Sequence, residues 1–132
     1  MNTTYSSSRT IAAPAASVWA LITTTDDITW RTDLSGIETT PDGYSEMNAQ
    51  TGWPATYSVT SEVPEVRREL RISHVDGHGT RTFALTPADD GTTIELTETF
   101  DFNGGDSIQP LFDEFMETQQ GTYLDDLARA AG

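Results

Sequence analysis

The 132-residue sequence contains no cysteine and no lysine. Without cysteine, the chain can form no disulfide, no thiolate nucleophile and no cysteine-based metal site. Its seven basic residues are all arginine and stand against 21 Asp and Glu, which gives a formal net charge of -14. Because a field of that sign repels phosphate backbones and anionic lipid surfaces, we expect no nucleic-acid partner and no membrane insertion.

The sequence also lacks an apolar run long enough to span a bilayer, and its polar first segment, Met1 to Arg9, does not read as a signal peptide. We therefore expect a soluble, cytoplasmic protein. No linker, repeat or low-complexity stretch divides residues 1–132, which predicts a single domain with its own core. The acidic residues are scattered rather than clustered, and this favours a salt-adapted or high-GC source over an acidic functional patch.

Hydrophobic periodicity predicts an α+β protein. A strand over Thr4–Ile11 leads into a helix that begins at Pro14, and a second short helical piece is expected over 28–34. Alternating residues then predict six hairpin-connected strands, over 37–40, 44–50, 54–63, 67–75, 79–87 and 92–102. A long helix over 106–131 follows, and an antiparallel sheet should curve around it.

Two turns give independent registers for neighbouring strands of this sheet. Asp76-Gly77 as a two-residue turn pairs Leu70 with Phe83. A four-residue loop over 88–91 pairs Phe83 with Leu96. Both registers bring apolar side chains to the same inner face, which we interpret as one wall of the core.

Arg81 and Glu98 interrupt that apolar face and lie opposite one another in the second register. One interpretation is a cross-strand ion pair near the open end of the sheet, worth about 0.2–1 kcal/mol. The other is a charged pair inside a cavity, where it orients a polar group of a bound molecule. His74 lies on the same face near the rim, whereas His78 points to the opposite face. The two histidines therefore cannot share a metal ion, and we expect no metal site.

The long C-terminal helix carries two polar residues, Gln119 and Tyr123, near the middle of its apolar stripe. The rest of the stripe is Phe112, Phe115, Met116, Leu127 and Ala130. A buried amide or phenol is costly unless it is hydrogen-bonded. The pair therefore indicates either the lining of a cavity or a glutamine at the rim beside a tyrosine bonded to the backbone.

Four segments together resemble the polyketide cyclase/dehydrase family of the START-like (SRPBCC) superfamily. They are Arg9–Pro14 leading into Val18–Leu21, Asp26–Trp30, Gly79–Phe83 and Gly91–Leu96. The resemblance covers nearly the whole chain. It implies a single START-like ligand-binding domain with the helix-grip fold, in which a seven-stranded antiparallel sheet curves around the long C-terminal helix and encloses a hydrophobic cavity. Two short helices are expected after the first strand. The family has no common catalytic residue set, so the resemblance assigns no active site.

Three functions are compatible with these features. The first is binding of a hydrophobic small molecule, of lipid, acyl or polyketide-like type, in the cavity. The second is a polyketide cyclase or dehydratase, with Glu98, Arg81 and Tyr123 as candidate acid–base groups. The third is an interaction module whose cavity is filled by its own side chains. The expected ligand-binding residues are Trp53, Tyr57, Arg81, Phe83, Leu96, Glu98, Phe100, Phe112, Phe115, Met116, Gln119 and Tyr123.

For Trp53 and Tyr57 the alternative is packing beneath the short helices. No glycine-rich phosphate loop precedes a helix, so we expect no phosphate-bearing cofactor, and the sequence points to no other. It leaves open the identity of the ligand and whether the chain forms a homodimer.

Overall fold

The computed structural model describes residues 2–132, which form seven strands and two helices. In chain order the elements are β1 (Asn2–Ile11), α1 (Ala15–Thr23), β2 (Leu34–Thr40), β3 (Gly43–Asn48), β4 (Pro54–Val63), β5 (Arg67–His74), β6 (Gly77–Ala88), β7 (Gly91–Phe102) and α2 (Gln109–Ala131). Every predicted strand is present, with ends shifted by three residues or fewer.

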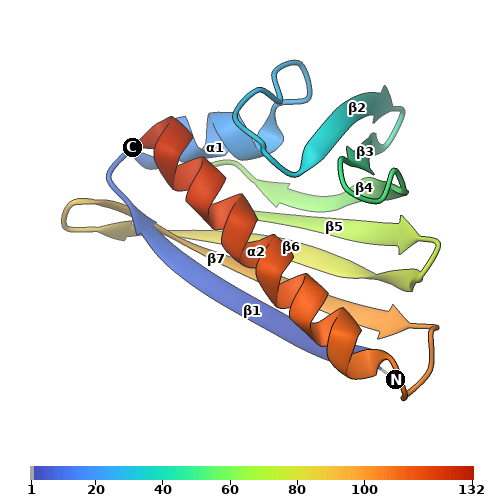
Figure 1. Ribbon diagram of the computed structural model, residues 1–132. Coiled ribbons are helices and arrows are strands. Elements are labelled where there is room, and N and C mark those ends of the chain that lie inside the picture. The colour runs from blue at the N-terminus through green and yellow to red at the C-terminus, as the bar shows by residue number, and fades with distance from the viewer. Residues whose placement is uncertain (1) are drawn as a thin grey trace.

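All seven strands belong to one antiparallel sheet with the order β1-β7-β6-β5-β4-β3-β2. The first strand therefore pairs with the last one, and β1 and β2 form the two edges. Figure 1 shows α2 running diagonally across one face of the curved sheet, with α1 beside its C-terminal end. The predicted α+β helix-grip fold is confirmed.

The core fills the space between this face of the sheet and the two helices. Its largest fully buried apolar side chains are Phe83, Ile11, Leu70, Ile94, Leu96, Leu127 and Val18. Full burial of one such side chain contributes about 1.5–3 kcal/mol, so this layer holds α2 against the sheet. Within residues 2–132, neither helix has the length and apolar character needed to cross a membrane.

The β5–β6 hairpin turns one residue earlier than the sequence predicts, which shifts the pairing partner of every β5 residue by two. Its turn residues are 75–76, and Leu70 pairs with Arg81 rather than with Phe83. Gly77 is the first residue of β6, where a side chain would not fit, because a Cβ would clash with a backbone carbonyl of β7. A shift of two residues leaves each side chain on its predicted face. The inner face is therefore correct although the predicted register is wrong.

The expected second short helix over 28–34 does not form, and this segment consists of turns that lead into β2. The Thr32 backbone N–H donates to Asp126 of α2 over 2.8 Å, and the Thr32 hydroxyl donates to the same carboxylate over 2.9 Å. Trp30 packs edge-on against Tyr123, with 5.5 Å between ring centroids. Contacts with distant side chains thus replace the local hydrogen bonds of a helix in this segment.

Candidate functional site

A pocket lies between the inner face of the sheet and α2, with a cavity volume of about 90 Å³. One water molecule needs only about 10–15 Å³, so this space exceeds an ordinary packing defect. The pocket is lined by side chains of β2–β7 and α2, with residues from the segments before β2 and β4. They are Arg31, Asp33, Leu34, Glu46, Asn48, Trp53, Ala55, Tyr57, Ile72, His74, Arg81, Leu96, Glu98, Phe100, Phe112, Phe115, Met116, Gln119, Gln120 and Tyr123.

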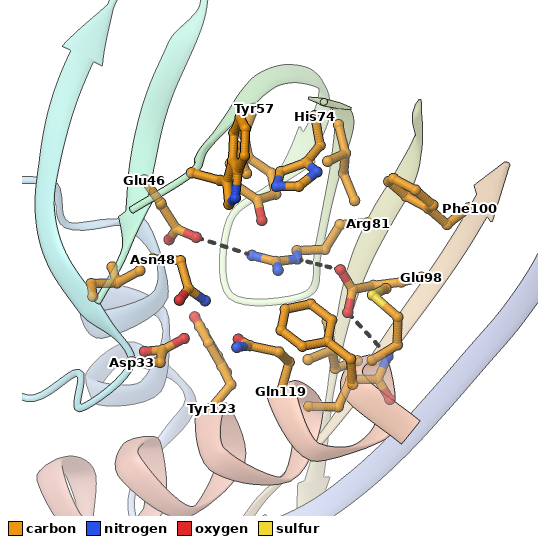
Figure 2. A pocket seen from close by; sticks show the side chains of 18 of the residues that line it. Asp33, Glu46, Asn48, Tyr57, His74, Arg81, Glu98, Phe100, Gln119 and Tyr123 are labelled. Atoms are coloured by element: carbon orange, nitrogen blue, oxygen red, sulfur yellow. Dashed lines mark hydrogen bonds and ion pairs between the residues drawn. The ribbon is translucent and has the colours of Figure 1, made fainter. Parts of the chain in front are cut away.

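A row of charged side chains of alternating sign crosses the pocket, and Figure 2 shows its central members, Glu46, Arg81 and Glu98. Arg81 Nε donates to Glu98 Oε2 over 3.1 Å, and Arg81 Nη1 lies 3.9 Å from Glu46 Oε1. Arg31 continues the row, because its Nη1 donates a hydrogen bond to Glu46 over 2.9 Å. Its Nε and Nη2 each donate a hydrogen bond to Asp33 over 2.9 Å. All five charged groups are almost fully buried.

The β6–β7 register that places Arg81 opposite Glu98 is confirmed. The pair is nevertheless not an exposed ion pair at the sheet margin, because Arg81 is 8% exposed and Glu98 is 3% exposed. Burial alone would lower the pKa of Arg81, but Glu98, Glu46 and the neighbouring phenols together outweigh this effect and the pKa is raised. Arg81 is therefore a permanent cation inside the pocket.

Gln120 of α2 holds the Glu98 end of this row in place. Its Nε2 donates to Glu98 Oε1 over 3.2 Å and to the backbone carbonyl of Tyr5 over 3.0 Å, while its Oε1 accepts from the Ser7 hydroxyl over 2.8 Å. Gln120 is only 1% exposed. These bonds tie the helix, the edge strand β1 and the charged row into one connected structure, which holds Glu98 and, through it, Arg81 in place.

Two tyrosines face the same space from opposite walls. Tyr57 on β4 lies 4.4 Å from the Arg81 guanidinium carbon, and Tyr123 on α2 lies 4.5 Å from that of Arg31, both measured to the ring centroid. Neither hydroxyl has a hydrogen-bond partner among residues 2–132. Burial raises the pKa of Tyr57 and of Tyr123 well above the ordinary phenol value, although the nearby arginine opposes the shift in each case. Both phenols therefore remain protonated at neutral pH and can donate a hydrogen bond.

The other half of the pocket is apolar and aromatic. Phe100 of β7 and Phe112 of α2 lie with their ring centroids 5.3 Å apart. Trp53 and Phe115 also line the pocket and are 51% and 38% exposed, so they mark its mouth. A ligand in this space would meet aromatic surfaces near the mouth and charged or phenolic groups deeper inside.

The structure brings together all the predicted ligand-binding residues except Phe83, together with His74 at the rim. Phe83 is fully buried, but it belongs to the core and packs against Tyr123 with 5.5 Å between ring centroids. Phe83 therefore does not line this pocket. Trp53 and Tyr57 line the pocket rather than packing beneath α1. Among residues 2–132, no three His, Asp or Glu side chains are placed to hold a metal ion.

Several pocket residues escaped the sequence analysis. They are Arg31, Asp33, Glu46, Asn48 and Gln120, with the apolar Leu34, Ala55 and Ile72. A signal existed for three of them. Strand alternation puts Glu46 and Asn48 on the same face as the buried Tyr44. Gln120 follows Phe112 and Met116 at intervals of four residues, which is helical spacing. Arg31 lies in an irregular segment where no periodicity applies.

Comparison with known proteins gives one family and a common fold. A family profile described as "Polyketide cyclase / dehydrase and lipid transport" matches residues 2–131. No curated protein sequence matches the chain. Among solved structures, the Zhui aromatase/cyclase from Streptomyces sp. R1128 matches with a TM-score of 0.81 at 14% identity, covering 99% of this chain and 94% of that one.

Two further solved structures share the architecture. A START superfamily protein from Mycobacterium smegmatis matches with a TM-score of 0.79 at 10% identity, covering 97% of this chain and 96% of that one. The Mll3558 protein from Rhizobium loti matches with a TM-score of 0.66 at 23% identity, covering 96% and 97%. At these identities the likeness concerns the fold alone.

Proposed function

The chain belongs to the polyketide cyclase/dehydrase and lipid transport family, and on that premise we propose that it binds a hydrophobic small molecule between the sheet and α2. Family membership supports a ligand-binding or cyclase role in general, as the sequence resemblance implied. The proposal is narrower: the ligand is a ring-containing or acyl compound that enters past Trp53 and Phe115.

One observation carries this proposal, namely the division of the pocket into an aromatic half and a charged half. Small-molecule sites are mostly apolar with a few polar groups that fix orientation. Here Phe100, Phe112 and Met116 supply the apolar surface, and Arg81 and Tyr123 supply the polar groups. The alternative of an interaction module filled by its own side chains receives no support, because about 90 Å³ of cavity remains.

Native mass spectrometry of the protein purified from its own source tests the proposal. A bound apolar compound near unit occupancy is the expected result, and denaturation would release it for identification. The variant Met116→Trp, which places a larger side chain in the apolar half, is expected to lower occupancy. Leu111→Trp is the matched control, because Leu111 is on the same helix and is 69% exposed. Equal occupancy in both variants, or an empty wild-type protein that also takes up no apolar probe, would contradict binding in this pocket.

The two phenols without hydrogen-bond partners favour a second candidate, a cyclase or dehydratase. Tyr57 and Tyr123 stay protonated, so either can donate a hydrogen bond to a developing oxyanion of a polyketide-like substrate. Glu98 is a weaker candidate base, because its two oxygens already accept hydrogen bonds from Arg81 and Gln120. With a poly-β-ketone thioester as substrate, Tyr123→Phe should lower turnover by about 10²- to 10³-fold and leave affinity nearly unchanged. Unchanged turnover in Tyr123→Phe and in Tyr57→Phe would exclude a catalytic role for these phenols.

A further inference from the structure

Arg81 has hydrogen-bonding capacity that the protein leaves unused. A guanidinium offers five N–H donors, and within residues 2–132 Arg81 donates only one hydrogen bond, from Nε to Glu98. Its Nη1 is completely buried and has no hydrogen-bond partner, since Glu46 lies 3.9 Å away. A buried donor without a partner is unfavourable and is rare in native proteins. Nη1 itself has no accessible surface, but Arg81 lines the pocket, and the other N–H donors of its guanidinium are unused as well.

The guanidinium is also held in a defined position. Tyr57 lies 4.4 Å from its central carbon, and Glu98 fixes the Nε edge while Gln120 fixes Glu98. Figure 2 shows Arg81 in the middle of the pocket, between Glu46 and Glu98 and facing Gln119 and Tyr123 of α2. The unused donors are therefore preorganised, and little conformational entropy is lost when they bind an acceptor.

The charge around Arg81 restricts which acceptor can bind. The buried row contains three carboxylates, Asp33, Glu46 and Glu98, but only two guanidiniums, Arg31 and Arg81. The cationic charge is thus already compensated, and the whole chain carries a formal charge of -14. An anionic ligand would enter a region of net negative charge, whereas a neutral oxygen acceptor would not.

We infer that the charged half of the pocket selects a neutral ligand carrying a carbonyl oxygen, which accepts a hydrogen bond from the Arg81 guanidinium, and discriminates against carboxylates. The inference rests on the proposed function, since it names the class of ligand that the same pocket takes. Arg81 is then a specificity-determining residue. The aromatic half binds the hydrocarbon skeleton of the ligand, and Arg81 determines which polar group of the ligand can be bound. The phenols of Tyr57 and Tyr123 are the next donors available to that oxygen.

Three naphthalenes of similar size and different polarity test this inference: 2-acetylnaphthalene, 2-ethylnaphthalene and 2-naphthoate. Affinities are measured by titrating each into ¹⁵N-labelled wild-type protein and following the amide resonances. The ketone is expected to bind about tenfold more tightly than the ethyl compound, because it supplies the acceptor that Arg81 lacks. The naphthoate is expected to bind at least about tenfold more weakly than the ketone.

The Arg81→Met variant removes the donors and keeps an unbranched side chain of similar reach. In it the ketone should lose its advantage over the ethyl compound. Arg71→Met is the matched control, because Arg71 is exposed and does not line the pocket, while its replacement removes the same charge. In this control the wild-type order of affinities should persist. Should Arg81→Met fail to fold, the ranking of the three probes on wild-type protein still decides the matter.

The outcomes separate the inference from the function on which it rests. Equal affinity for the ketone and the ethyl compound would overturn the inference, because the ketone oxygen would then gain nothing from a hydrogen bond with Arg81. Tightest binding by the naphthoate would also overturn it, by showing that the pocket prefers anions. In both cases the proposed function, binding of a small molecule in this pocket, would remain supported. Failure of all three probes to shift any pocket resonance would instead overturn the proposed small-molecule binding, and the inference with it.

Discussion

Gln120 provides a direct test of the hydrogen-bond network behind the pocket. The change is Gln120→Met, which preserves an unbranched side chain of similar volume and comparable helix propensity but removes the amide. It eliminates three hydrogen bonds, to the Tyr5 carbonyl, to Ser7 and to the Glu98 carboxylate.

The magnitude follows from the burial and charge of these three partners. A neutral hydrogen bond contributes about 0.5–1.5 kcal/mol and one to a charged group about 1.5–3 kcal/mol. Ser7 is only half-buried and can rebind water, and the methionine gains some apolar burial, so both effects reduce the loss. We expect Gln120→Met to lower the free energy of unfolding by about 2–4 kcal/mol. For a domain of this size that corresponds to a melting temperature lower by about 10 °C.

The neighbouring Gln119→Met variant is the control. Gln119 is half-buried, lines the pocket and has no hydrogen-bond partner within residues 2–132, so its replacement should change the free energy of unfolding by less than about 0.5 kcal/mol. Both variants are measured by urea denaturation followed by far-ultraviolet circular dichroism. A loss below about 1 kcal/mol for Gln120→Met, or equal losses for the two variants, would refute the reasoning.

Three further predictions concern stability. Asp126 is 2% exposed and accepts hydrogen bonds from Thr32 and Arg129; Asp126→Ala should cost about 2–4 kcal/mol in urea denaturation and speed hydrogen exchange of the Thr32 amide. Asp125→Ala, at an exposed neighbouring position, is the control and should change neither the free energy of unfolding by that amount nor the hydrogen exchange of the Thr32 amide. Burial, with the carboxylate of Asp113 at 2.6 Å, raises the pKa of Tyr5 to about 12. The unfolded phenol loses its proton near pH 10, so stability should fall from about pH 10 to pH 12. This loss of stability should be smaller in Tyr5→Phe. If the urea midpoint fell equally steeply with pH in the wild-type protein and in Tyr5→Phe, Tyr5 would not be its cause. The formal charge of -14 predicts a melting temperature that rises between low and molar KCl as self-repulsion is screened, and a flat or falling curve would count against salt adaptation.

The order and type of the strands followed from the sequence because their signals are local. Alternation of apolar side chains and the turn chemistry around 88–91 act over a few residues, and they gave the pairing of Arg81 with Glu98 before the structure did. The apolar stripe of α2 is local in the same way. These features depend on backbone periodicity, which short stretches of sequence express fully.

Other features depended on contacts that no local pattern contains. At the β5–β6 hairpin, Gly77 is a strand residue that lies too close to the backbone of β7 to carry a side chain. Segment 28–34 bonds to Asp126 of the distant helix α2 instead of forming a helix. The periodicity of α2 identified an inward face with a glutamine in it, but the choice of Gln120 rather than Gln119 as the bonded residue came from Tyr5, 115 positions away in the chain.

The charged row shows the same division. Sequence alternation indicated that Arg81 and Glu98 face inward, and only the tertiary structure placed Arg31 and Glu46 beside them. A buried charge is tolerated only where partners of opposite sign surround it, and those partners come from an irregular segment and a different strand. The sequence by itself therefore determined the sheet, the helix and the inward faces, whereas folding decided which polar groups meet in the pocket, because that depends on distances between segments far apart in the chain.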